Sequence, residues 1–64
     1  MFSIRLRLLR KSLGLNQCDF ALVFSVTQVT ISYWERRIRE PDFDTLCKLC
    51  DYFDVTADYL LGRD

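Results

Sequence analysis

A run of uncharged side chains that can donate, accept or make apolar contacts spans residues 27–33, with the sequence TQVTISY. If this segment is helical, Ile31 and Trp34 fall on one face and point toward a core. The exposed face of a helix usually carries charged side chains such as lysine and glutamate, and this one carries neither. We therefore interpret the exposed face as a contact surface.

Base edges in the major groove of DNA are the partners that fit this chemistry. An α-helix fits that groove, where each base pair presents its own pattern of donors, acceptors and methyl groups. Gln28 can pair with N6 and N7 of adenine, Val29 can meet a thymine methyl group, and Thr27 offers a hydroxyl and a methyl. Tyr33, one turn further on, can reach a base edge or a phosphate. The opposing interpretation packs Val29 inward and lays Tyr33 along its own helix.

Phosphate contacts can come from both sides of this segment and from the segment itself. Asn16 and Gln17 begin the preceding helix, where free N–H groups and the positive end of the helix dipole favour an anion. The other candidates are two hydroxyl groups of the segment and two arginines of the loop after it: Thr30, Ser32, Arg37 and Arg39. For the arginines, an ordinary solvated turn is the alternative.

Two short helices, at about 17–24 and 28–36, must position these groups. Asn16 and Thr27 are the expected N-caps, because their side-chain oxygens can accept a free N–H of the first turn. The apolar face of the earlier helix is formed by Phe20, Ala21 and Phe24.

A helix of about ten residues precedes this pair. Ser3 is its expected cap, and Gly14 is its expected left-handed end. Four apolar residues at helical spacing predict its inward stripe: Ile4, Leu6, Leu9 and Leu13.

Two more helices follow the basic loop, and Asp42 and Thr56 are their expected caps. The buried face of the fourth helix is predicted to hold Phe43, Leu46, Leu49, Cys50 and Phe53. The last helix ends at Gly62 and is anchored by Tyr59, Leu60 and Leu61. Because no strand-like alternation occurs, we predict an all-α fold, a compact bundle of about five short helices.

Length and composition indicate one domain, residues 1–64, with a core just large enough to fold alone. Half of the residues are apolar and nine are aromatic, so neither a metal nor a disulfide is expected to be needed for folding, and no cofactor is expected. No apolar run approaches the roughly 20 residues of a membrane span. The opening segment MFSIRLRLLRK is charged throughout and has no signal-peptide core. We therefore expect a soluble, cytoplasmic protein of a bacterial or phage-infected cell that does not bind a membrane.

The formal net charge is zero, but the charges are divided unevenly. Residues 1–39 hold seven basic and two acidic side chains, a net +5, and residues 40–64 hold two basic and seven acidic ones, a net −5. This division predicts one surface that attracts nucleic acid and one that repels it, unless it is merely an ordinary solvated surface.

The cysteines and the absence of histidine exclude several kinds of site. Cys47 and Cys50 form a CxxC pair inside a predicted helix, and Cys18 lies far off in sequence. A structural zinc site needs four ligands, so no metal site is predicted, and we expect small, reduced side chains. With no histidine, no nucleophile paired with a base and no glycine-rich phosphate loop, we do not expect an enzyme. No small-molecule site is apparent either.

The chain resembles the helix-turn-helix family of Cro and the phage repressors, which includes the xenobiotic-response-element-like regulators. The pattern LxQxxxA…VxxxxIxxWE is met by Leu15, Gln17, Ala21, Val26, Ile31, Trp34 and Glu35. Matches outside it include Arg5, Leu6, Leu9, Arg10, the loop 39–41, Thr45, Leu46, Leu49 and the closing segment 55–62. The resemblance covers nearly the whole chain and implies a lambda-repressor-like fold with its helix-turn-helix at about 16–36.

The resemblance also implies roles for single residues. It supports base reading by residues 27–29 and 33, and it gives Gln17 a phosphate-facing role. In similar domains an arginine of the first helix pairs with a glutamate at the end of the recognition helix, and Arg10 and Glu35 fill these positions. We expect them to form a structural ion pair.

Two positions depart from the family pattern. The family often has glycine in the turn between the two helices and just after the recognition helix, where this chain has Ser25 and Arg37. If both positions need a left-handed backbone, each costs roughly 1 kcal/mol or more.

These observations predict a sequence-specific DNA-binding domain of a bacterial or phage transcriptional regulator, a repressor that binds an inverted-repeat operator as a homodimer. The expected dimer surface lies on the last two helices, at Tyr52, Val55, Tyr59 and Leu61. One alternative is an antitoxin-like protein-interaction module with an acidic partner surface between residues 42 and 58. A second alternative is a thiol-responsive switch built on the three cysteines.

Overall fold

The computed structural model describes residues 1–63, and these form five helices and no strand. The helices are α1 (Phe2–Ser12), α2 (Gln17–Val23), α3 (Gln28–Glu35), α4 (Phe43–Phe53) and α5 (Ala57–Leu61). The prediction of an all-helical bundle is confirmed. Within the described residues, no helix is long and apolar enough to cross a membrane.

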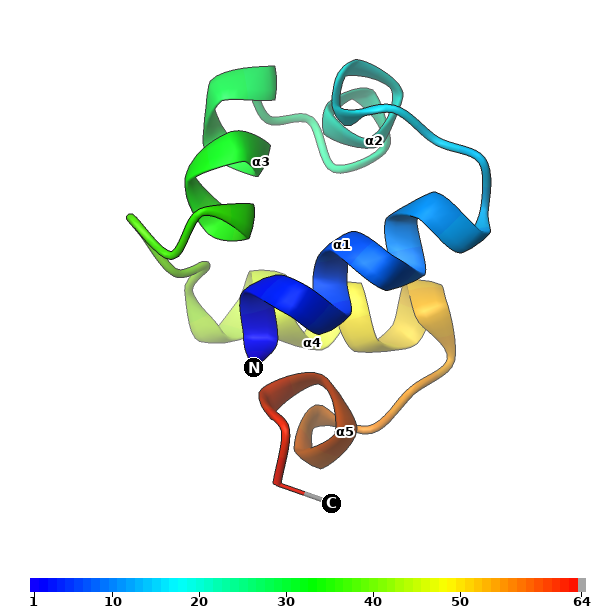
Figure 1. The fold of residues 1–64 in the computed structure, drawn as a ribbon, viewed down its shortest axis with the longest axis vertical. Coiled ribbons are helices and arrows are strands. Elements are labelled where there is room, and N and C mark those ends of the chain that lie inside the picture. The colour runs from blue at the N-terminus through cyan, green and yellow to red at the C-terminus, as the bar shows by residue number, and fades with distance from the viewer. Residues whose placement is uncertain (64) are drawn as a thin grey trace.

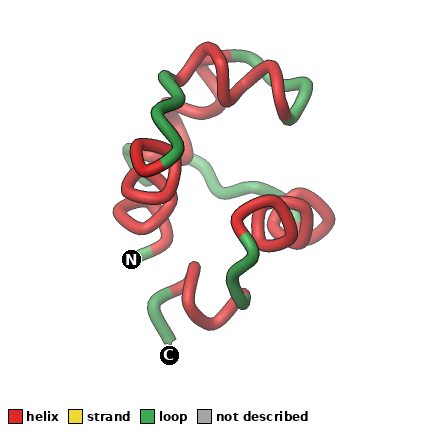
Figure 2. The backbone as a smooth tube through the Cα atoms, turned by 90° about the vertical axis from the view of Figure 1, so that its right-hand side faces the viewer, coloured by secondary structure: helices red, strands yellow, loops and turns green. Residues whose placement is uncertain are grey.

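The helices are arranged so that α2 and α3 lie together at one end of the molecule. In Figure 1 these two helices are at the top, α1 crosses the middle in front of α4, and α5 lies at the bottom. Figures 1 and 2 both place the start of the chain near α5. The start of α2 and the start of α3 lie at the end of the molecule opposite α5 (Figure 1).

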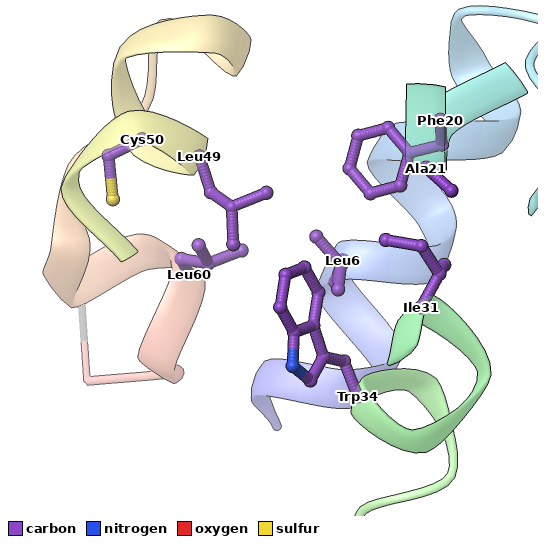
Figure 3. Packing of buried hydrophobic residues seen from close by; sticks show 8 residues of the cluster. All are labelled: Leu6, Phe20, Ala21, Ile31, Trp34, Leu49, Cys50 and Leu60. Carbon is purple, nitrogen blue, oxygen red and sulfur yellow. The ribbon is translucent and has the colours of Figure 1, made fainter. Parts of the chain in front are cut away.

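A single core joins all five helices (Figure 3). Its buried apolar members are Leu6, Phe20, Ala21, Ile31, Trp34, Leu49, Cys50 and Leu60. The ring of Phe20 has no exposed surface and lies 5.0 Å from the ring centre of Phe24 and 5.6 Å from that of Phe53. Because aromatic pairs at such separations contribute about 0.5–1.5 kcal/mol beyond area burial, this cluster fastens α2 onto α4.

Side-chain caps begin four of the helices, as predicted. The side chains of Asn16, Thr27, Asp42 and Thr56 each accept the backbone N–H three residues further on. Each such cap stabilises its helix by about 1 kcal/mol. Hydrogen bonding with Thr45 also lowers the pKa of the Asp42 carboxyl.

The predicted cap of α1 is wrong. The helix begins at Phe2, with Met1 in the cap position and no side-chain cap, and Ser3 is a buried residue of its first turn. Ser3 faces inward because it lies three residues before Leu6, on the same side of the helix.

The predicted inward stripe of α1 is only partly correct. Leu6 is fully buried and Leu9 packs against the core, but Ile4 and Leu13 are more than half exposed. The α1 sequence is apolar on several sides, so periodicity alone allows more than one stripe. The buried side of α1 instead includes Arg10, whose guanidinium forms an enclosed ion pair with Glu35.

Three anchors predicted for α4 and α5 also differ from the structure. Phe43 is 76% exposed, because it is the first residue of α4 and helical side chains lean toward the N-terminus, beyond the core. In α5, Leu60 is fully buried, whereas Tyr59 and Leu61 keep more than a third of their surface exposed. The five-residue helix therefore turns only one side chain fully inward.

The three cysteines do not share one environment. Cys18 and Cys47 are exposed and Cys50 is buried, and burial raises the pKa of the Cys50 thiol. Among residues 1–63, no group of three histidine, cysteine or acidic side chains is arranged to hold a metal ion.

Left-handed backbone occurs at both positions where the family often has glycine. Ser25 has φ 56° and Arg37 has φ 63°, and Asp54 at the end of α4 also has φ 56°. Each residue with a Cβ in this region costs roughly 1 kcal/mol or more. The turn between α2 and α3 therefore has a left-handed residue other than glycine, at some loss of stability.

Replacement of Ser25 by glycine should stabilise the protein by about 1 kcal/mol, because glycine adopts a left-handed backbone without steric cost. For a domain of this size the melting temperature should rise by roughly 4–8 °C in a thermal unfolding experiment. The matched control is Ser12→Gly in the last turn of α1, which should lower the melting temperature. A Ser25→Gly variant no more stable than the parent would show that the strain at residue 25 does not exceed the entropy that glycine adds to the unfolded chain.

Candidate nucleic-acid interface

Helix α3 has two distinct faces. At about 100° per residue, Ile31 and Trp34 point to one side and are buried. The opposite arc of about 140° holds the side chains of Gln28, Val29, Ser32 and Tyr33, and the C-cap residue Arg36 continues it. Val29 is 51% exposed, so the interpretation that packs it inward is wrong. The exposed arc is uncharged until its last residue.

Four side chains are linked in a chain of hydrogen bonds that runs from the start of α3 to α1. The Gln28 amide donates to the Gln17 side-chain oxygen at 2.6 Å. The Gln17 amide in turn donates to Glu35 Oε1 at 3.2 Å. Glu35 also accepts from Arg10, at 2.6 Å from Nε and 3.1 Å from Nη2. Gln17 and Gln28, the first residues of α2 and α3, are thus in direct contact. Gln17 is hydrogen-bonded to the ion pair, and Gln28 is linked to it through Gln17.

The guanidinium of Arg10 is almost completely enclosed, and all three of its nitrogens have partners. Besides its two bonds to Glu35, it donates from Nη1 to the backbone oxygen of Leu15 at 2.7 Å. Charge-assisted bonds in this forked arrangement are stronger than neutral ones and fix orientation. The pair therefore sets how α1, the start of α2 and the end of α3 lie relative to one another.

Several predicted contact groups also serve inside the chain. The Asn16 side-chain oxygen accepts from Asp19 N at 2.8 Å, and its amide NH₂ is left to donate to another partner. The Thr27 hydroxyl accepts from Thr30 N at 3.2 Å and lies 2.9 Å from the Thr30 hydroxyl. At these positions the side chains therefore build the helix starts as well as the candidate interface.

The two loop arginines lie apart from the starts of α2 and α3. Arg37 and Arg39 are exposed, and they line a hollow together with Trp34 and the first residues of α1. The predicted site therefore divides into a cluster at the starts of α2 and α3 and a basic group beyond the end of α3.

Arg36 is a residue of this surface to which the sequence analysis gave no role. Its Nε donates to the Ser32 hydroxyl at 3.0 Å, and its guanidinium carbon lies 5.7 Å from the centre of the Tyr33 ring. The sequence could have indicated these contacts, because Arg36 lies four residues after Ser32 and three after Tyr33. Residues three and four positions apart are neighbours on a helix.

Substitution of Arg10 by alanine should destabilise the protein by about 3–5 kcal/mol, because it leaves the Glu35 carboxylate enclosed without its counter-charge. Urea unfolding monitored through Trp34 measures this change. The control is Arg7→Ala on the exposed side of α1, which should change stability by no more than about 0.5 kcal/mol. An unchanged midpoint for Arg10→Ala would contradict a structural role for the pair.

Comparison with known proteins gives matches over almost the whole chain. Residues 6–60 match the helix-turn-helix family. The HTH-type transcriptional regulator ImmR of Bacillus subtilis strain 168 is 40% identical over 60 residues, which are 94% of this chain and 47% of that protein. Repressor protein C2 of Salmonella phage P22 is 37% identical over 60 residues, 94% of this chain and 28% of the phage protein. The chain thus spans about half or less of these relatives.

A solved structure matches the fold in full. The crystal structure of the P22 c2 repressor in complex with a synthetic operator superimposes with a TM-score of 0.88 at 34% sequence identity. The match covers 100% of this chain and 97% of that one. From these matches in sequence and in fold, the chain belongs to the helix-turn-helix family of Cro and phage-repressor type.

Proposed function

We propose that this chain is the sequence-specific DNA-binding domain of a bacterial or phage transcriptional regulator, and that it acts as a repressor. The observation that carries the proposal is the exposed, nearly uncharged face of α3. Gln28, at the start of this face, is held in place by a hydrogen bond to Gln17 of α2. A match to a repressor whose structure contains operator DNA supports the same assignment.

In this proposal α3 enters the major groove and Gln28 reads adenine. One N–H of the Gln28 amide is given to Gln17, which leaves its second N–H and its oxygen. That oxygen can accept from N6 of adenine while the remaining N–H donates to N7. Val29, exposed beside it, meets a thymine methyl group, and Thr27 and Tyr33 complete the base-reading set.

Phosphate contacts surround these base contacts. The Gln17 amide has one N–H bonded to Glu35 and a second that can donate to a phosphate beside the start of α2. The Asn16 amide adds a second donor there, and the start of α2 favours an anion. The remaining phosphate contacts come from two hydroxyl groups of α3 and the two loop arginines: Thr30, Ser32, Arg37 and Arg39.

The protein is proposed to bind double-stranded DNA as a homodimer. Two copies of α3 would read half-sites about 34–36 Å apart, one turn of the duplex. The contact between copies would use partly exposed apolar residues of α4, α5 and the loop between them: Tyr52, Val55, Tyr59 and Leu61.

Selection from a pool of random DNA duplexes at moderate salt, followed by sequencing, tests the function directly. We expect an inverted repeat with an A·T pair at corresponding positions of both half-sites. Gln28→Ala should relax the preference at that pair by about 1–3 kcal/mol, and Lys48→Ala on α4 is the control that should leave it unchanged. Absence of any enriched sequence would exclude base reading and redirect the search to protein partners.

Reversal of charge at Arg37 and Arg39 tests the phosphate contacts separately. Removal of one phosphate contact should reduce the slope of log Kobs against log salt concentration by about 0.9, because fewer counterions are released. Affinity should fall similarly for all DNA sequences, since phosphate contacts carry no base information. An unchanged affinity and salt slope would remove both arginines from the interface.

A further inference from the structure

Arg36 directly follows α3 as its C-cap residue and continues the candidate reading face of that helix. At about 100° per residue, it points between Gln28 and Ser32 on one side and Val29 and Tyr33 on the other. It is also the one charged side chain of this arc. In the proposed docking this arc faces the major groove, so Arg36 faces the groove as well.

The side chain of Arg36 is held in place by two residues of α3, Ser32 and Tyr33. Its Nε donates to the Ser32 hydroxyl at 3.0 Å, and the guanidinium lies over the face of the Tyr33 ring, 5.7 Å from its centre. A cation within about 6 Å of an aromatic ring centre is attracted to it. These two contacts restrict a side chain that would otherwise be mobile at the surface.

The outer two nitrogens of the Arg36 guanidinium remain available. Within residues 1–63 its only hydrogen bond is made by Nε, so Nη1 and Nη2 have no partner. The neighbouring carboxylate of Glu35 is already bonded to Arg10 and Gln17. A planar pair of donors of this kind matches O6 and N7 of guanine, the commonest specific contact in the major groove.

We propose that Arg36 reads a guanine in each half-site, as a specificity-determining residue. This inference rests on the proposed DNA-binding function. It adds a guanine contact to the adenine contact proposed for Gln28. Arg36 lies eight residues after Gln28, about 12 Å along the helix axis. It therefore reads a different base pair from the adenine of Gln28, roughly three to four steps away along the groove at about 3.4 Å per base pair.

The test compares the unmodified chain with Arg36→Ala in selections from the same random pool. For the unmodified chain we expect one G·C position in each half-site with a preference of roughly 5- to 150-fold, as a bidentate contact provides. In Arg36→Ala this preference should fall below about twofold, with the other positions kept. The matched control is Arg63→Ala, which removes the same charge beyond α5 and should keep every preference.

A change on the DNA side makes the test independent of protein folding. Replacement of that guanine by 7-deazaguanine removes the N7 acceptor, so it should weaken binding of the unmodified chain and leave binding of Arg36→Ala unchanged. A uniform loss of affinity in Arg36→Ala with a smaller salt slope and intact base preferences would identify a phosphate contact and overturn the proposal. No effect of Arg36→Ala on affinity or preference would overturn it too. An unmodified chain that enriches no sequence would overturn both this inference and the proposed function.

Discussion

The enclosed ion pair between Arg10 and Glu35 is the interaction on which the geometry of this protein depends. It joins α1 to the last turn of α3, and through the Leu15 carbonyl it also fixes the approach to α2. Removing two charges from water is costly, so such a pair adds little net stability compared with an apolar contact of the same shape. Its effect is to exclude other arrangements of these helices, because any of them would leave a charge enclosed without a partner.

The same pair reaches the candidate interface through Gln17. A glutamine amide at a protein surface ordinarily rotates among several conformations, and each contact it makes must offset that loss of freedom. Here Gln17 is bonded at both ends, and Gln28 is bonded to Gln17. The donors and acceptors are therefore positioned before any partner arrives, which lowers the entropic cost of binding.

Features that depend on a few neighbouring residues could be predicted from the sequence. The caps at Asn16, Thr27, Asp42 and Thr56 were predicted correctly because a cap joins a side chain to an N–H three residues away. The left-handed backbone at Ser25 was likewise expected, from the family's use of glycine at that turn.

Features that depend on how the helices pack could not be predicted in the same way. The exposure of Ile4 follows from the tertiary placement of Arg10, which selects one of several apolar stripes on α1. The bond between Gln17 and Gln28 requires the crossing of α2 and α3, and the contacts of Arg36 require its side-chain conformation. The residue types at the candidate interface were thus accessible to sequence reasoning, whereas their mutual positioning was not.

Thr27 has two roles, as the N-cap of α3 and as a proposed base-reading residue, and this limits how the preferred DNA sequence of such a protein can change. Its hydroxyl caps the first turn of α3, and Thr27 is also one of the residues proposed to read bases. Only serine, threonine, aspartate, asparagine and glycine begin a helix well. Variation at this position is therefore restricted to these five residue types, and aspartate would add electrostatic repulsion from the DNA phosphates. Substitutions that change the operator preference should therefore be tolerated better at residues 28 and 29, which do not cap the helix, than at residue 27.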